Sequence, residues 1–245
     1  MANNETGTLQ PVADAARLCR RYGARLHVDA VQAAGRIPVD LEALGAHSLA
    51  LSSHKVGGPQ GAGALLLAPD ALVARDAPAI AADRALIAGG GQERGWRGGT
   101  PGLPAIAGFA AAAEAAGDAT PLGGLRDAVE RAAIRHGALI CGAGAPRLAN
   151  TTCLALPGIR ADAQVIALDL DGIAVSAGAA CSSGKVTTSH VLAAMGLGEL
   201  AGQAIRVSLP WNVTEAAIDA FVHAYERMAT RLRDALLAPV AMPAA

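Results

Sequence analysis

The chain has 245 residues, of which 52% are hydrophobic, so it can bury one large core or two smaller ones. A formal net charge of -1 provides no broad attraction for phosphate backbones or anionic lipid, which argues against nucleic-acid binding. The N-terminus lacks the basic residues of a signal peptide, and the most apolar helical run is too short to cross a bilayer. We therefore expect a cytoplasmic protein that binds neither nucleic acid nor a membrane.

The predicted elements of the first half alternate between helix and strand. Apolar spacing predicts, in chain order, a helix over 11–22, a strand over 26–30, a short helix over 40–44, strands over 48–51 and 61–68, and a helix over 104–116. This order is typical of an α/β sheet, in which ligands bind outside the carboxyl ends of the strands. Asp29 and Lys55 both lie at such ends.

The second half predicts an α+β unit. Its pattern indicates helices over 125–136, 161–170, 189–195 and 214–237, and strands over 150–156, 173–176 and 204–209. The sequence Pro121-Leu122-Gly123-Gly124 predicts a hinge between the halves. We therefore expect two domains, 1–120 and 121–245.

The four cysteines have neither the close pairing of a zinc site nor the density of a disulfide framework. Cys19 and Cys153 have apolar neighbours, as small buried hydrophobic residues do, and Cys141 is similar. Cys181 differs, because small residues surround it. We expect no resident metal.

Lys55 follows a predicted strand and precedes a glycine-rich run, Gly57-Gly58-Pro59-Gln60-Gly61. This order differs from a P-loop, in which the glycines come before the lysine. The pattern suits an amine that points into a pocket, where desolvation favours the neutral form that makes an imine with an aldehyde. A solvated lysine in a glycine loop is the alternative that this segment leaves open.

Asp29 ends an otherwise apolar strand, where a carboxylate needs a cationic partner. The pyridinium nitrogen of pyridoxal phosphate is one such partner. An equally good interpretation is a helix N-cap, since Ala30 and Val31 could begin a helix.

Several motifs resemble, in the same order, those of the cysteine desulfurases of the NifS/IscS family. The matching segments are Asn3-Asn4-Glu5-Thr6-Gly7, Leu26-His27-Val28-Asp29-Ala30-Val31-Gln32, Ser52-Ser53-His54-Lys55-Val56-Gly57-Gly58, Gly89-Gly90-Gly91-Gln92-Glu93-Arg94-Gly95, Ser176-Ala177-Gly178-Ala179-Ala180-Cys181 and Ala204-Ile205-Arg206-Val207-Ser208-Leu209. The resemblance implies the α/β fold of PLP-dependent transferases of fold type I. It implies part of the large domain with a parallel-type sheet, followed by the small C-terminal domain.

The same resemblance implies a site for pyridoxal 5'-phosphate. Lys55 would hold the cofactor as an imine, Asp29 would pair with the ring nitrogen, and Ser52 and His54 would bind the phosphate. Asn4 and Gln32 would lie near the ring hydroxyl, Asn4 and Arg206 would bind substrate, and Thr100 would reach the cofactor of a partner subunit. A homodimer is therefore expected.

Cys181 is implied to be the catalytic sulfur acceptor. Its thiolate would attack the sulfur of L-cysteine, leaving L-alanine and a persulfide that supplies an acceptor or iron-sulfur scaffold protein. Whether Cys181 also binds a transient iron-sulfur cluster is left open by the sequence. The alternatives are a selenocysteine lyase, which would not need Cys181, and a catalytically inactive remnant or scaffold subunit.

In the family, a long segment precedes the motif that corresponds to Asn3-Asn4-Glu5, with which the printed sequence opens. We therefore expect an N-terminally truncated chain with exposed apolar sheet edges. By itself it should bind pyridoxal phosphate weakly and have little desulfurase activity.

Overall fold

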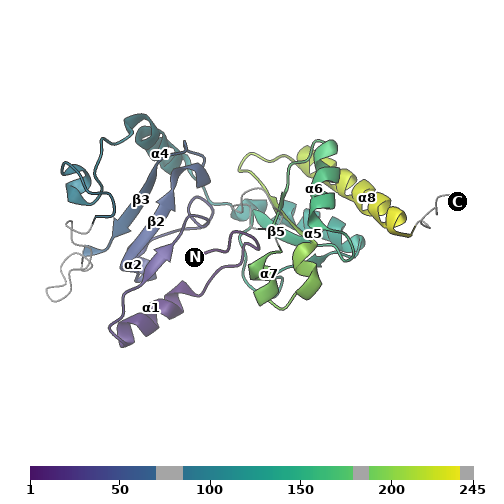
Figure 1. Cartoon of the computed structure of the whole chain (residues 1–245), viewed down its shortest axis with the longest axis horizontal. Helices are drawn as coiled ribbons and strands as arrows, with labels where there is room; N and C mark the ends of the chain where they lie inside the picture. The colour runs from purple at the N-terminus through teal and green to yellow at the C-terminus, as the bar shows by residue number, and fades with distance from the viewer. Residues whose placement is uncertain (70–84, 179–187, 238–245) are drawn as a thin grey trace, which may run out of the picture. The chain divides into compact units, whose positions relative to one another are not determined.

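The computed structural model describes residues 1–69, 85–178 and 188–237. Its contacts divide the chain into two compact units, each described by itself (Figure 1). The first comprises Met1–Ala2 and Gln10–Asp118, and the second Asn3–Leu9 and Ala119–Ala245. That residues 1–120 and 121–245 are separate folding domains stays a prediction.

The first unit has a three-stranded sheet in the order β1-β2-β3. Its elements are α1 (Val12–Arg21), β1 (His27–Asp29), α2 (Leu41–Leu44), β2 (Ser48–Ser52), the 3-10 helix η1 (Ser53–Lys55), β3 (Gly63–Leu67), the 3-10 helix η3 (Gln92–Gly95) and α4 (Leu103–Ala115). All the helices and strands expected in this half are present. Local signals fix their ends: the Asp40 side chain accepts the N–H of Ala43 to cap α2, and Gly45 ends that helix at a φ of 63°.

The first sheet is mixed. β1 and β2 are parallel, as expected, but β3 runs antiparallel to β2, with Ser52 opposite Gly63. The ten residues between β2 and β3 comprise η1 and a glycine-rich turn, and they are closed by a hydrogen bond from the N–H of Ser53 to the carbonyl of Ala62. A parallel return needs a longer crossover, usually a helix, so this connection dictates an antiparallel strand.

The outer strand β3 exposes apolar side chains. Leu65 and Leu66 of β3 are 52% and 38% exposed, in line with the expected apolar edge. One face of the sheet contributes Val28 and Leu49 to a small core cluster with Ala30 and Ala46. The core of this unit is therefore thin.

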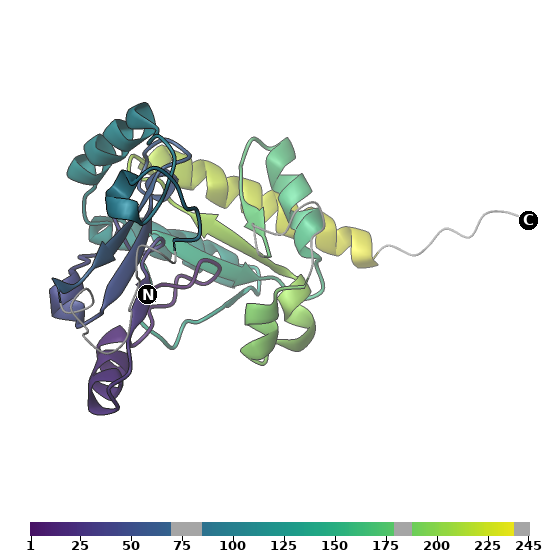
Figure 2. The ribbon, with the colours of Figure 1, turned by 60° about the vertical axis from the view of Figure 1, so that its left-hand side comes forward.

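The second unit has a four-stranded antiparallel sheet in the order β4-β5-β7-β6. Its elements are the 3-10 helix η4 (Thr120–Leu122), α5 (Gly123–Arg135), β4 (Leu139–Ile140), β5 (Thr151–Ala155), α6 (Ala161–Leu170), β6 (Ser176–Ala177), α7 (His190–Ala194), the 3-10 helix η5 (Gly198–Gly202), β7 (Ala204–Ser208) and α8 (Glu215–Leu237). α8 lies beside α5 and α6, as Figure 2 shows.

Two expectations for this half need correction, and one strand was missed. The hinge expected at Pro121–Gly124 is η4 followed at once by the first turn of α5. The strand expected over 173–176 is displaced to Ser176–Ala177, where β7 supplies the hydrogen-bonding partner. β4 was not expected, because its two residues are too few to show a period.

The two faces of the second sheet differ in what covers them. Leu154, Ile205 and Val207 point to the main core, which they form with residues of α5, α6 and α8 such as Val129, Leu168 and Tyr225. The alternate residues, among them Cys153 and Arg206, point to the opposite face. There Cys153 and its neighbours pack against Leu192 of α7 and Ala201 of η5.

Among the described residues, no helix has the length and apolar character needed to cross a membrane.

Candidate functional site

The carboxyl ends of β1 and β2 place several predicted site residues at one edge of the first sheet. Asp29 is the last residue of β1 and lies opposite Ala50, two residues before Ser52 at the end of β2. Because the two strands are parallel, these ends meet at the same edge. The helix η1 then adds His54 and Lys55 directly after Ser52.

The Asp29 side chain is exposed and caps a turn. Its Oδ1 accepts the N–H of Val31 at 2.9 Å, while Oδ2 has no hydrogen-bond partner among the described residues. Residues 31–36 are turns, so the alternative interpretation as a helix N-cap is wrong. One carboxylate oxygen thus stays available at this sheet edge.

Ser52 and His54 form a pair at the same edge. Ser52 Oγ lies 2.9 Å from His54 Nδ1, a hydrogen bond whose donor depends on the tautomer of the imidazole. Nε2 of the exposed His54 ring has no partner among the described residues. A ring oriented in this way can offer Nε2 to an anion.

Lys55 is half-buried, and its amine has no hydrogen-bond or ion-pair partner within the described ranges. The glycines after it shape the turn. Gly57 and Gly61 have φ values of 93° and 86°, which favour glycine, and a Cβ at Gly58 would lie 2.4 Å from Ser53 Oγ. This turn therefore packs against η1 only with glycine at position 58.

Gln32 and Thr100 also belong to the first unit. Gln32 is half-buried, and its carbonyl accepts a hydrogen bond from Arg36 Nη1 at 3.0 Å. Thr100 is exposed and follows η3, in which Glu93 and Arg94 have φ values of 50° and 56°. Two consecutive non-glycine residues in the left-handed backbone conformation indicate a strained turn.

The chemistry of this donor set fits pyridoxal phosphate. An unpaired amine can react with the aldehyde, a free carboxylate oxygen can pair with the ring nitrogen, and an oriented imidazole can bind phosphate. Asp29, His54 and Lys55 supply these three groups at one sheet edge.

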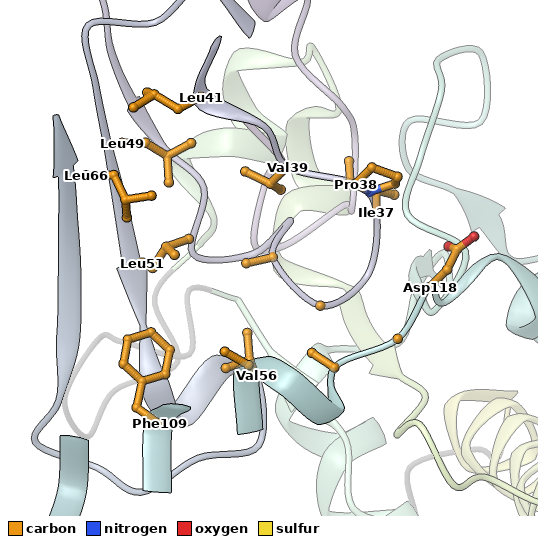
Figure 3. A pocket seen from close by; sticks show the side chains of 15 residues that line it. Ile37, Pro38, Val39, Leu41, Leu49, Leu51, Val56, Leu66, Phe109 and Asp118 are labelled. Atoms are coloured by element: carbon orange, nitrogen blue, oxygen red, sulfur yellow. The ribbon is translucent and has the colours of Figure 1, made fainter. Parts of the chain in front are cut away.

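A separate cavity of about 420 Å³ lies in the first unit (Figure 3). Leu49, Leu51 and Leu66 from the sheet and Phe109 from α4 line it, and Asp118 contributes a carboxylate at one end. None of the predicted site residues lines this cavity. It is an apolar gap over the sheet, separate from the predicted site residues.

Asn4 and Arg206 belong to the second unit, where the structure brings them together. Arg206 Nη1 donates to the carbonyl oxygen of Asn4 at 2.8 Å, and Nη2 donates to Ser176 Oγ at 3.0 Å. Sequence reasoning missed Ser176, since only the pairing of β6 with β7 brings it opposite Arg206.

Cys141 and Cys153 form a buried thiol pair on the same sheet face as Arg206. They are 2% and 3% exposed, and the N–H of Cys141 donates to the carbonyl of Cys153 at 2.9 Å. A hydrogen bond with Cys141 and burial raise the pKa of the Cys153 thiol. The expectation of a buried residue is confirmed for both, whereas Cys19 is only half-buried.

A family comparison decides which proteins this chain is related to. The model of the family described as "Aminotransferase class-V" matches residues 1–221. The chain belongs to the class-V aminotransferase family. The fold class expected from the sequence, that of PLP-dependent transferases, is thereby confirmed.

Within the class-V aminotransferases, the resemblance to cysteine desulfurases is confirmed. The chain is 41% identical to a cysteine desulfurase of Cereibacter sphaeroides over 237 residues, covering 95% of this chain and 59% of the relative. It is 35% identical to the solved NifS-like protein of Rickettsia africae, with a TM-score of 0.78, covering 93% of this chain and 60% of that one.

A third relative is the protein SspA, solved in complex with cysteine. It is 32% identical, with a TM-score of 0.66, and the match covers 85% of this chain and 57% of that one. The chain thus spans about three fifths of the length of the class-V relatives that it matches.

The predicted sulfur acceptor, Cys181, lies outside the described residues. Among those that are described, no group of three or more His, Cys, Asp or Glu side chains could hold a metal ion.

Proposed function

We propose that this chain contributes the lysine, sulfur-acceptor and substrate-binding residues of a pyridoxal-phosphate-dependent cysteine desulfurase. One observation carries the proposal: an unpaired lysine, a half-free carboxylate and an oriented histidine share one sheet edge in a class-V aminotransferase. The enzyme would remove sulfur from L-cysteine, give L-alanine and supply the sulfur for iron-sulfur cluster or thio-cofactor assembly.

The predicted residues have distinct roles in holding the cofactor. Pyridoxal phosphate supplies an electron-accepting ring that stabilises negative charge next to the substrate carboxylate. The residues that would hold it are Lys55 at the aldehyde, Asp29 at the ring nitrogen, Ser52 and His54 at the phosphate, Asn4 and Gln32 near the ring hydroxyl, and Thr100 at the cofactor of a partner subunit.

The reaction also requires a substrate clamp and a sulfur nucleophile. The Arg206 guanidinium would bind the carboxylate of L-cysteine through paired N–H groups. The Cys181 thiolate would attack the substrate sulfur, so that a new S–S bond forms as the C–S bond breaks. The products are L-alanine and a persulfide on Cys181.

The proposal extends to the setting of the enzyme. We infer a cytoplasmic homodimer whose persulfide is passed to a sulfur-acceptor or iron-sulfur scaffold protein. The role proposed for Thr100 supports the dimer, because that residue would serve the partner's cofactor. The apolar strand β3, with Leu65 52% exposed, offers a surface that further chain could cover.

Cysteine turnover with matched cysteine variants tests the proposal. The chain, supplied with excess pyridoxal phosphate and L-cysteine, should release L-alanine at a low rate and gain one sulfur atom on the peptide that contains Cys181. Cys181→Ser should abolish the persulfide, and the control Cys19→Ser should retain it. Alanine release that persists in Cys181→Ser with selenocysteine would instead indicate a selenocysteine lyase. Absence of both products would indicate an inactive subunit.

A further inference from the structure

Ser176 begins the motif that contains Cys181, but the role proposed for that motif assigns no function to the serine. It lies on β6 directly opposite Arg206 on β7, so the two side chains share one face of the second sheet. Its hydroxyl oxygen accepts a hydrogen bond from Arg206 Nη2 at 3.0 Å. The pair is therefore built by the strand register and not by proximity in sequence.

A second acceptor fixes the other end of the guanidinium. Arg206 Nη1 donates to the main-chain oxygen of Asn4 at 2.8 Å. Two anchors on different nitrogens define the plane of a rigid, planar group. Rotation about the terminal side-chain bonds would break at least one of them.

Both anchors are neutral. No carboxylate of the described residues lies within ion-pair distance of Arg206, and its Nε is buried without a hydrogen-bond partner. A buried donor without a partner is costly in a folded protein. The arrangement holds the orientation of the cation but leaves its charge and at least one N–H group available to an anion.

We propose that Ser176 is a positioning residue that holds the Arg206 guanidinium in the plane needed to bind the carboxylate of L-cysteine. This inference rests on the proposed function, in which Arg206 binds that carboxylate. A serine suits the task because its neutral hydroxyl accepts a hydrogen bond and leaves the charge of the arginine unbalanced. An aspartate in the same place would neutralise that charge. In this role Ser176 acts through Arg206.

Steady-state kinetics of four variants test the inference in the cofactor-loaded chain. Ser176→Ala should raise KM for L-cysteine about tenfold and leave kcat within about twofold, because only orientation for binding is lost. Ser176→Thr keeps the hydroxyl and should restore KM. Ser208→Ala is the matched control, since Ser208 lies exposed on β7, two residues from Arg206 on the same face.

Arg206→Lys separates failure of the inference from failure of the proposed function. If Arg206→Lys raises KM but Ser176→Ala does not, the positioning role is wrong and the proposed function stands. If neither variant changes KM, both are wrong.

Nuclear magnetic resonance provides a readout that does not depend on turnover. The Nε–H signal of Arg206, assigned by its loss in Arg206→Lys, should report an ordered side chain in the unsubstituted protein. Ser176→Ala should speed both its hydrogen exchange and its motion, whereas Ser176→Thr and Ser208→Ala should not. An unchanged Nε–H signal in Ser176→Ala would overturn the inference even in a chain without activity.

Discussion

The two units position their candidate side chains in different ways. In the first, Asp29, His54 and Lys55 stand at strand ends, with free polar atoms and few contacts among the described residues. In the second, Arg206 lies inside a strand and is held by two hydrogen bonds from distant parts of the chain. The candidate residues of the first unit are placed by local sequence, and Arg206 is oriented by tertiary structure.

The cores of the two units also differ, because the second is more completely buried than the first. The second unit buries Leu154 and Ile205 completely beneath three helices. The first buries Leu49 beside an apolar cavity of about 420 Å³ and leaves Leu65 half exposed. Order in the first site should therefore depend more on what binds to it.

Truncation of matched leucines should give the largest effect. We expect Leu154→Ala to lower the stability of the second unit by about 2–5 kcal/mol, because it opens a new cavity in a filled core. Leu49→Ala should cost less, about 2 kcal/mol, since one side of Leu49 already faces empty space. Hydrogen exchange of the β5 and β2 amides measures each unit separately. Equal costs would break the comparison.

A second pair of variants compares the sites themselves. Arg206→Lys should destabilise the second unit by about 1–3 kcal/mol, because a lysine cannot keep both anchored hydrogen bonds. His54→Ala in the first unit should change stability by less than about 0.5 kcal/mol, since the ring is exposed. Urea unfolding monitored by amide exchange distinguishes the two. A larger loss in His54→Ala would contradict this account.

The sequence predicted the positions of the candidate residues in the first unit better than the contacts of Arg206 in the second, for a physical reason. Lys55 and Asp29 end strands and are followed by turn-forming residues, so their positions follow from neighbours in the chain. The contact between Arg206 and Asn4 spans 202 positions, and the one with Ser176 depends on a strand pairing. Short-range sequence patterns do not determine which distant strands pair or in which register.

Two further features could not be predicted, because they too depend on contacts between residues far apart in the sequence. The segment Asn3–Leu9 groups with the second unit, where Thr8 bridges to Arg147. The thiols of Cys141 and Cys153 meet only because β4, a strand of two residues, pairs with β5. By contrast, α6 follows its predicted bounds, Ala161–Leu170.

Cysteine reactivity should sharpen the contrast between exposed and enclosed groups. The hydrogen bond with Cys141 and burial raise the pKa of Cys153, so its thiol stays neutral at pH 7. We expect iodoacetamide to modify the half-buried Cys19 well before Cys153 in the native protein. Peptide mass spectrometry measures both rates, and equal rates would show that the β4–β5 region opens readily.

The smallest expected effect is a surface titration on α8. A hydrogen bond from Arg135 lowers the pKa of Glu226. The resulting stabilisation is present above the ordinary pKa of a glutamate and is lost as the pH falls through the lowered value in the folded protein. Arg135→Ala should raise this pKa, as measured by carboxyl carbon resonances, whereas Arg131→Ala on the same helix should not.

The central claim is that the amine of Lys55 holds the cofactor, and the chain contains only one other lysine, Lys185. The chain should be incubated with excess pyridoxal phosphate, reduced with borohydride and mapped by peptide mass spectrometry. We expect the pyridoxyl group on Lys55, with Lys185 unmodified at the same concentration. Modification of Lys185 while Lys55 stays free would contradict the account.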